Sequence, residues 1–365
     1  MRGAHLVPCS GAVVWASERP LRRHEIWPVF KALVYRSHRE LSGEVSLSKR
    51  EEPSIIAESE RITVVEANVT SARSATRRLP RTLPFFAWAS FVLNVLIIGT
   101  GGAVRLTGSG LGCSDWPLCT PGSLVPTQEL GIHGLIEFGN RTISGPLLIA
   151  AVAVWILSFL IRKQRRDLLI ISSIVLAGVL IQALIGGIVV WMHLNANLVG
   201  FHYFLSLALV CVTAAYLGRM RETPGPRELA VPVPFMILSH LTTVVLLVTV
   251  VFGILTTGAG PHSGDANIER DGFDATLLSH IHAWPGYALA VLTLALLVWA
   301  AIRRLRPLPW LIVLLATQLV QIIVGVYQAR AGLPPLAVGV HMVLAALLSA
   351  AMVMVILRLK RPAAV

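Results

Sequence analysis

The chain has 365 residues, of which 55% are hydrophobic and only 14% are charged. Its mean hydropathy of +0.71 excludes an ordinary soluble globular protein and favours one that crosses a membrane several times. The net charge of +12 does not indicate a nucleic-acid-binding protein, because the basic residues are confined to short clusters between long apolar runs.

Residues 1–80 differ from the remainder, since they are polar, mixed in charge and contain no apolar run of membrane-spanning length. We expect a disordered cytoplasmic tail here, or a translation start assigned too far upstream. A short apolar piece at 6–16 resembles a weak signal peptide, but no convincing cleavage site follows it. The fold is therefore expected in the residues that follow.

Apolar runs of about 20 residues predict eight transmembrane helices. These runs cover roughly 83–104, 142–161, 168–190, 198–218, 231–257, 277–301, 308–328 and 336–357. Arginine and lysine cluster in alternate loops and at both ends of the bundle, which places those loops and both termini in the cytoplasm. The predicted protein is all-α and passes through the cell (plasma) membrane many times, with its lipid-facing surfaces apolar.

Two stretches centred on a histidine are related by an offset of 139 residues. Val199–His202 matches Val338–His341, and the same offset relates Gln182 to Gln321 and Gly186 to Gly325. The repeat predicts two tandem four-helix bundles, at 81–220 and 221–365, related by a pseudo-two-fold axis along the membrane normal.

Histidines inside apolar helices are rare and usually functional. His133, His202, His282 and His341 all fall within about 10 Å of the predicted outer helix ends. In the second half, His282 and His341 suit axial ligation of a heme iron, because two neutral imidazoles can face each other across a helix bundle. The thiolates or carboxylates of a zinc or di-iron site are absent there.

The first half matches only one of these two ligands. His202 corresponds to His341, but the partner of His282 falls near Asn140 when a three-residue gap is allowed. The pattern therefore predicts a saturated low-spin heme site in the second half. In the first half it predicts a heme site with a weaker or replaceable ligand.

A polar face of the second predicted helix adds a carboxylate to the first-half site. Helical spacing puts His133, Glu137, Asn140 or Arg141, and Ser144 along one face. Glu137 and Arg141 are four residues apart, so they either form only an ion pair or provide a proton acceptor and a cation beside the heme.

The first predicted outward loop contains Cys113 and Cys119, six residues apart on the oxidising face. We expect a disulfide, which is either a loop staple or a redox-active pair that exchanges with an outside thiol–disulfide partner. Arg105 and Arg330, at outer helix ends, either bind heme propionates or anchor their helices at the interface.

Several motifs resemble those of heme A synthases. They are the run from Gly101 to Cys119, Glu137-Phe-Gly-Asn140-Arg141, Gly260–Asp265, Ile281-His282-Ala283 and Val338–His341. The resemblance covers about 82–358 and is closest to the actinobacterial branch, which has the two-cysteine loop and writes asparagine within the Glu-x-x-His-Arg motif.

The resemblance implies an oxidoreductase that converts the C8 methyl group of heme O to the formyl group of heme A for a terminal oxidase, with oxygen drawn from water. It implies that His282 and His341 hold a heme b cofactor and that His202 binds the iron of the substrate heme O. At the departure from the family pattern, Asn140, either His133 replaces the missing ligand or the iron is five-coordinate or binds water. We expect His133 to replace it.

The resemblance also implies further site residues and partners. Glu137 is the expected base or proton relay, Arg141 lies with it at the substrate heme, and Cys113 and Cys119 are candidate catalytic residues if their disulfide is redox-active rather than a loop staple. Expected partners are a heme O synthase that supplies the substrate and an electron acceptor that the sequence does not identify. The rival interpretations are a diheme cytochrome b that only transfers electrons, a transporter with a histidine proton path, and a heme-handling assembly factor without turnover.

Overall fold

The computed structural model describes residues 79–262, 264–265 and 272–363, so the predicted tail at 1–80 lies outside it except for its last two residues. The described residues contain eight helices long and apolar enough to cross a membrane. They are α3 (Leu83–Leu106), α4 (Gly131–Leu160), α5 (Arg166–Trp191), α6 (Ala196–Met220), α7 (Val233–Ala259), α8 (Ala275–Ile302), α9 (Leu308–Arg330) and α10 (Pro335–Arg358). The prediction of an all-α, eight-helix membrane protein is confirmed.

One helix is considerably longer than its predicted span. The second apolar run is expected at 142–161, but α4 begins at Gly131, directly after a 3-10 turn at Gln128–Leu130. The extra turns carry Glu137 and Arg141, whose charges interrupt the apolar run. These side chains are tolerated in the helix because each has hydrogen-bond partners in the loop that follows α3.

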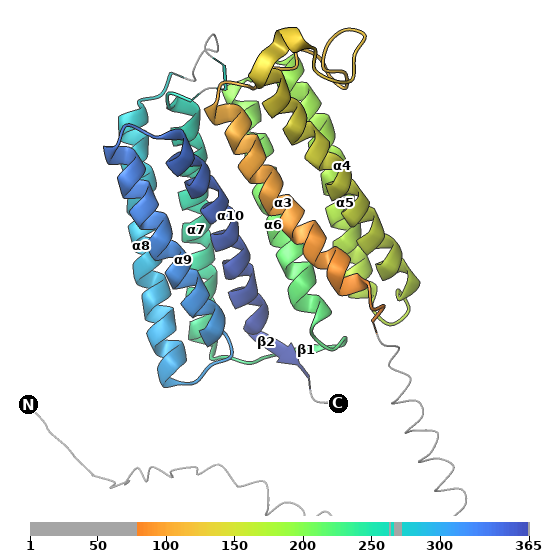
Figure 1. Ribbon diagram of the computed structural model, residues 1–365. Helices are drawn as coiled ribbons and strands as arrows, with labels where there is room; N and C mark the ends of the chain where they lie inside the picture. Colours follow the sequence, from red (N-terminus) through yellow and green to blue (C-terminus); the bar gives the residue numbers. More distant parts are fainter. Residues whose placement is uncertain (1–78, 263, 266–271, 364–365) are drawn as a thin grey trace, which may run out of the picture. The chain divides into compact units, whose positions relative to one another are not determined.

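The eight helices form two four-helix groups that meet along a common interface (Figure 1). Helices α4 and α5 lie at one edge of the molecule, α8 and α9 lie at the other, and α3, α6, α7 and α10 lie between them. Gly200 on α6 approaches Ile254 on α7, and the repeat-related Gly339 on α10 approaches Leu106 on α3. The pseudo-two-fold axis between the groups stays a prediction.

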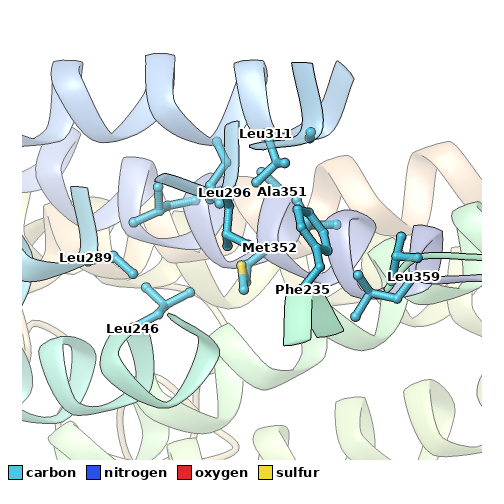
Figure 2. Close-up of a cluster of buried hydrophobic side chains, with 13 residues drawn as sticks. Phe235, Leu246, Leu289, Leu296, Leu311, Ala351, Met352 and Leu359 are labelled. Carbon is cyan, nitrogen blue, oxygen red and sulfur yellow. The ribbon is translucent and has the colours of Figure 1, made fainter. Parts of the chain in front are cut away.

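Side-chain packing rather than burial from water holds such helices together within a bilayer. Figure 2 shows the buried cluster of the second group, which α7, α8, α9 and α10 all contribute to; Phe235, Leu296, Leu311 and Val355 are fully buried in it. A separate cluster around Ile98, with residues of α6 and α10, joins the two groups. Buried apolar side chains therefore hold the second group together and join it to the first, and this packing fixes the helices that carry the polar side chains.

The two ends of the bundle differ. At one end, β1 (Arg227–Leu229) pairs antiparallel with β2 (Lys360–Pro362) and ties the segment between the groups to the chain after α10. At the other end lies the loop 107–127, which contains the disulfide (Figure 1). We call these the sheet end and the disulfide end.

Candidate heme sites at the disulfide end

His282 on α8 and His341 on α10 lie next to each other near the disulfide end. Their ring centroids are 6.1 Å apart with an angle of 76° between the ring planes. Two imidazoles on opposite sides of one iron, with metal–nitrogen bonds of about 2 Å and ring radii of about 1 Å, give a separation of about 6 Å. The pair predicted from the sequence is therefore brought together at the spacing of two axial ligands.

The hydrogen bonds of this pair leave nitrogen atoms available for a metal. His282 Nδ1 is 2.9 Å from the carbonyl oxygen of Thr249, which can only accept, so Nδ1 carries the proton and Nε2 has its lone pair free. His341 Nδ1 is buried without a hydrogen-bond partner among the described residues. A buried polar atom in this state is costly, and it indicates a missing partner.

A glycine on the neighbouring helix faces each of these rings. A Cβ atom on Gly253 of α7 would lie 2.9 Å from His282 Cε1, and one on Gly325 of α9 would lie 3.0 Å from His341 Cε1. Both distances are below ordinary van der Waals contact, so only glycine allows the rings their positions. Each ring therefore lies against a glycine (a glycine cradle) where a larger residue would have to displace it, and the ring spacing together with the unpartnered His341 nitrogen fits an iron held between the two imidazoles.

The first group repeats half of this arrangement. His202 on α6 faces Gly186 on α5, with 3.6 Å from the position of a Cβ to His202 Cε1, and its Nδ1 is also buried without a partner. Gln182 donates a hydrogen bond to the carbonyl of His202 (2.9 Å) as Gln321 does to the carbonyl of His341 (3.0 Å). The sequence repeat contains both glutamines, but their contact with the histidine turns is visible only in the structure.

Asn140 on α4 occupies the remaining position of the first group. Its Oδ1 lies 3.8 Å from the position of a Cβ on Gly101 of α3 and accepts a hydrogen bond from Thr100 Oγ1 at 2.8 Å. His133, two turns closer to the disulfide end, is exposed, and its Nδ1 is 2.9 Å from Ser109 Oγ. The structure thus separates two residues that the sequence analysis assigned to one site.

Glu137 and Arg141 fasten the disulfide loop to α4. Glu137, only 4% exposed, pairs with Arg141 at 2.5 Å, and its second oxygen accepts the backbone N–H of Cys113 at 2.6 Å. The Arg141 guanidinium also donates to the carbonyls of Asp115 (2.7 Å), Leu118 (2.9 Å) and Cys113 (3.2 Å). The ion pair expected from the i,i+4 spacing is present, and it organises a loop as well.

The predicted disulfide is present, since Cys113 and Cys119 are bonded to each other, with their Cα atoms 4.4 Å apart. Trp116, within the closed loop, packs on Gly187 of α5, where a Cβ would lie 2.6 Å from the indole, and contacts Trp191 edge to face at 5.6 Å. The loop therefore covers α4 and α5 at the disulfide end. Neither Trp116 nor Gly187 carried a signal in the sequence.

The two arginines considered for propionate binding differ in their contacts. Arg105 at the end of α3 donates to the carbonyls of His262 and Thr257, each at 2.6 Å, and so ties the first group to the loop that follows α7. Arg330 is exposed at the end of α9. Among the described residues, no group of three or more His, Cys, Asp or Glu side chains gathers around a point.

Comparisons with known proteins point to one family. Residues 84–262 match the family model of the cytochrome oxidase assembly proteins (COX15-CtaA). The chain is 38% identical to a heme A synthase from Exiguobacterium sp. strain AT1b over 131 residues, which are 35% of this chain and 42% of that protein. It is 31% identical to a heme A synthase from Staphylococcus saprophyticus over 175 residues, 46% of this chain and 57% of the relative. A third heme A synthase, from Staphylococcus haemolyticus, is 31% identical over 179 residues, 47% of this chain and 58% of that protein.

The chain thus matches about half the length of these curated relatives. The matched part contains α3 to α6 and α7, with the disulfide loop, Glu137, Asn140 and His202. The family indicated by the sequence motifs agrees with the family found by comparison, whereas the actinobacterial branch stays a prediction. Over this matched part, slightly less than half of its length, the chain is similar to the cytochrome oxidase assembly family and to its heme A synthases.

Proposed function

We propose that this protein is a heme A synthase that oxidises the C8 methyl group of heme O to the formyl group of heme A in the plasma membrane. In this reaction the methyl group and one water become the formyl group, and four electrons and four protons leave. The observation that carries the proposal is the unequal pair of heme sites. Both groups have a histidine whose ring faces a glycine of the neighbouring helix, but among the described residues a buried carboxylate–arginine pair lies only in the first group.

The second group, with His282 and His341, fits a heme b that stays bound. A heme held there supplies a one-electron redox centre. Two imidazole ligands and two glycine cradles support retention, because both faces of the iron are then held by the protein. The first group fits the substrate heme O, with His202 as its protein ligand and Arg141 beside it.

Glu137 is proposed as the group that takes up protons from the reacting methyl carbon or its water. Its carboxylate is shielded from solvent and is held by Arg141 and by the N–H of Cys113. A carboxylate fixed in this way has one orientation, which favours proton transfer to or from a bound substrate. The same contacts link it to the disulfide, so Cys113 and Cys119 are proposed to tune this group or to exchange with an outside thiol–disulfide partner.

The partners follow from this reaction. A heme O synthase has to supply the substrate, and a membrane-accessible electron acceptor has to remove electrons through the second heme. The basic residues at the sheet end support a cytoplasmic location for that end and for both termini. A diheme cytochrome b that only transfers electrons would gain nothing from the Glu137–Arg141 pair or from an asparagine at a ligand position.

The test is co-expression of the full chain with a source of heme O, followed by mass analysis of the hemes extracted from the membrane. We expect heme A or its hydroxylated intermediate. Heme O left unchanged would favour an assembly factor, only heme b would favour the cytochrome, and no bound heme would favour a transporter; each of these results would overturn the proposal.

Variants of Glu137 sharpen the test. Glu137→Gln keeps an oxygen that can accept the N–H of Cys113 but cannot take up a proton as a carboxylate does. We expect this variant to bind heme O normally and to yield little heme A. Normal heme A accumulation in Glu137→Gln and in Glu137→Ala would remove Glu137 from the reaction while leaving the rest of the proposal intact.

A further inference from the structure

Asn140 lies where the first group should have its second iron ligand. It faces Gly101 of α3 in the same way that His282 of α8 faces Gly253 of α7, and α3 and α7 are the first helices of their groups. Each side chain also forms a hydrogen bond with the first helix of its group, although the bonds differ: Asn140 accepts from the Thr100 hydroxyl, and His282 donates to the backbone carbonyl of Thr249. Asn140 is therefore the structural counterpart of His282.

His133 does not lie at this level of the bundle. It precedes Asn140 by seven residues on the same helix, which is about 10 Å along the axis. Its ring is exposed and directed to Ser109, a fully buried residue that also bonds to Thr107. The backbone of His133 packs tightly against Gly112 of the disulfide loop, which fixes the start of the helix. His133 thus contacts the disulfide loop and not the glycines that face the site residues.

We infer that the iron of the heme in the first group has a single protein ligand, His202, and that the amide of Asn140 stands on its other side. The inference rests on the proposed function for the identity of this heme. An amide is a weak ligand for iron compared with an imidazole. The sixth coordination position is consequently open in the first group and closed by His282 in the second.

The hydrogen bond from Thr100 orients the amide. Because Asn140 Oδ1 accepts the hydroxyl proton at 2.8 Å, its Nδ2 is the atom left to face the heme. No hydrogen bond of Nδ2 is found among the described residues, so an N–H donor of Asn140 is available to a ligand bound in the site. Asn140 is in this sense a positioning residue that can hold a small ligand at the open coordination position by a hydrogen bond.

This difference gives the two hemes different exchange behaviour. A heme held by two imidazoles has both axial bonds made by the protein, whereas a heme held by one is released when a single bond breaks. A substrate must enter and a product must leave, and a cofactor must stay. Replacing one imidazole by an amide at Asn140 therefore separates substrate from cofactor within one repeated architecture.

The test is carbon monoxide binding to the purified full chain, loaded with both hemes and reduced with dithionite. CO binds to a ferrous heme with an open sixth position and not to one closed by two imidazoles. We expect about half of the heme to bind CO in the wild type. Almost no CO binding in the wild type would overturn the inference.

Two variants should change the fraction of heme that binds CO in opposite directions. Asn140→His should close the open position and abolish CO binding, with the low-spin absorption signal roughly doubled. The matched change His282→Asn should open the second site, so that nearly all bound heme takes CO. CO binding left unchanged in a heme-loaded Asn140→His would overturn the inference.

His133→Ala is the control that separates the inference from the ligand role expected for His133. It should bind the same fraction of CO as the wild type, since its ring lies away from the iron. A larger CO-binding fraction in His133→Ala would make His133 the ligand and overturn the inference, even if the other variants failed to fold.

Failure of the inference can be told apart from failure of the proposed function. The CO measurement depends on coordination alone, whichever heme the first group contains. Extracted hemes report turnover independently. CO binding to about half of the heme, with no heme A formed, would contradict the function and support the inference. Heme A formed by a protein that binds no CO would support the function and contradict the inference.

Discussion

The two four-helix groups place a histidine at the same point of their last helices, but they differ at the second helix. In α8 the site residue is His282, bonded to a carbonyl of α7; in α4 it is Asn140, bonded to a hydroxyl of α3. The residues one turn before and directly after are Ser279 and Ala283 in α8 but Glu137 and Arg141 in α4. Among the described residues, the Ser279 hydroxyl donates to the carbonyl of Thr276 in its own helix.

The comparison shows how one architecture can serve two tasks. A glycine faces the site residues in both groups, closely in the second and at ordinary contact distance in the first, and the glutamine contacts recur in both. Within the part of the chain that the structure describes, the buried carboxylate–guanidinium pair and the disulfide lie in the first group. If the proposed function holds, the second group binds its heme through two histidines. The first group has Asn140 in place of one histidine and has Glu137 and Arg141 next to it for the reaction.

The largest effect is expected from removing the last-helix histidines one at a time. His202→Ala should lose nearly all heme of the first group, because no second imidazole remains there, and the total heme falls by about half. His341→Ala leaves His282 and should retain part of the second heme in a high-spin state. Heme per protein and the absorption spectrum measure both. Equal and complete losses in the two variants would remove the difference between the groups.

The sequence predicted the elements of this comparison but not its geometry. The offset of 139 residues correctly relates His202 to His341 and Gln182 to Gln321. The reason is that the connection from α5 to α6 has the same length as the connection from α9 to α10. Gly101 and Gly253 are not related by that offset, since the loops after α3 and α7 differ in length. Their role as cradles depends on where the neighbouring helices pass, which no linear pattern encodes.

The position of His133 shows the same limit from the other side. Helical spacing puts it on one face with Glu137 and Asn140, and to that extent the periodicity was informative. Periodicity does not give the position of a residue along the membrane normal, however. Because α4 begins at Gly131, His133 lies in its first turn and contacts Ser109 of the loop that follows α3. The disulfide, by contrast, was predicted from the six-residue spacing of the two cysteines and from the placement of their loop on the outer face, and the structure contains it.

Glycine cradles offer a test of intermediate size. Gly253→Ala and Gly325→Ala would put a Cβ about 3 Å from an imidazole carbon, a clash that costs about 1–3 kcal/mol or shifts the ring. Gly186→Ala and Gly101→Ala are the matched controls, because their Cβ atoms would meet the site residues at 3.6 and 3.8 Å, which is ordinary contact. We expect lower heme retention in the first pair only. Measured heme per protein that falls equally in all four would show that the cradles of the two groups are equivalent.

Arg141→Ala tests the contribution of the Glu137–Arg141 pair and its hydrogen bonds to the disulfide loop. The change leaves the buried Glu137 carboxylate without its cation and three loop carbonyls without a donor, which we expect to destabilise the group by about 3 kcal/mol. Faster cleavage of the loop 107–127 by an added protease and a lower melting temperature measure the effect. Arg162→Ala, which removes an exposed arginine near the other end of α4, is the control and should change neither. A loop that stays resistant in Arg141→Ala would show that the disulfide holds it without help.

The smallest effect is expected from the disulfide itself. Closing a six-residue loop restricts the unfolded chain by an amount worth about 2 kcal/mol, so Cys113→Ser with Cys119→Ser should lower the melting temperature by only a few degrees. The loss should be smaller still because Arg141 and the packing of Trp116 on α5 continue to hold the loop. Heme content is expected to be unchanged, which makes heme A yield the informative measurement. A yield that collapses in a folded, heme-loaded double variant would identify the cysteines as redox participants, whereas a normal yield would identify them as a staple of the group that carries the chemistry.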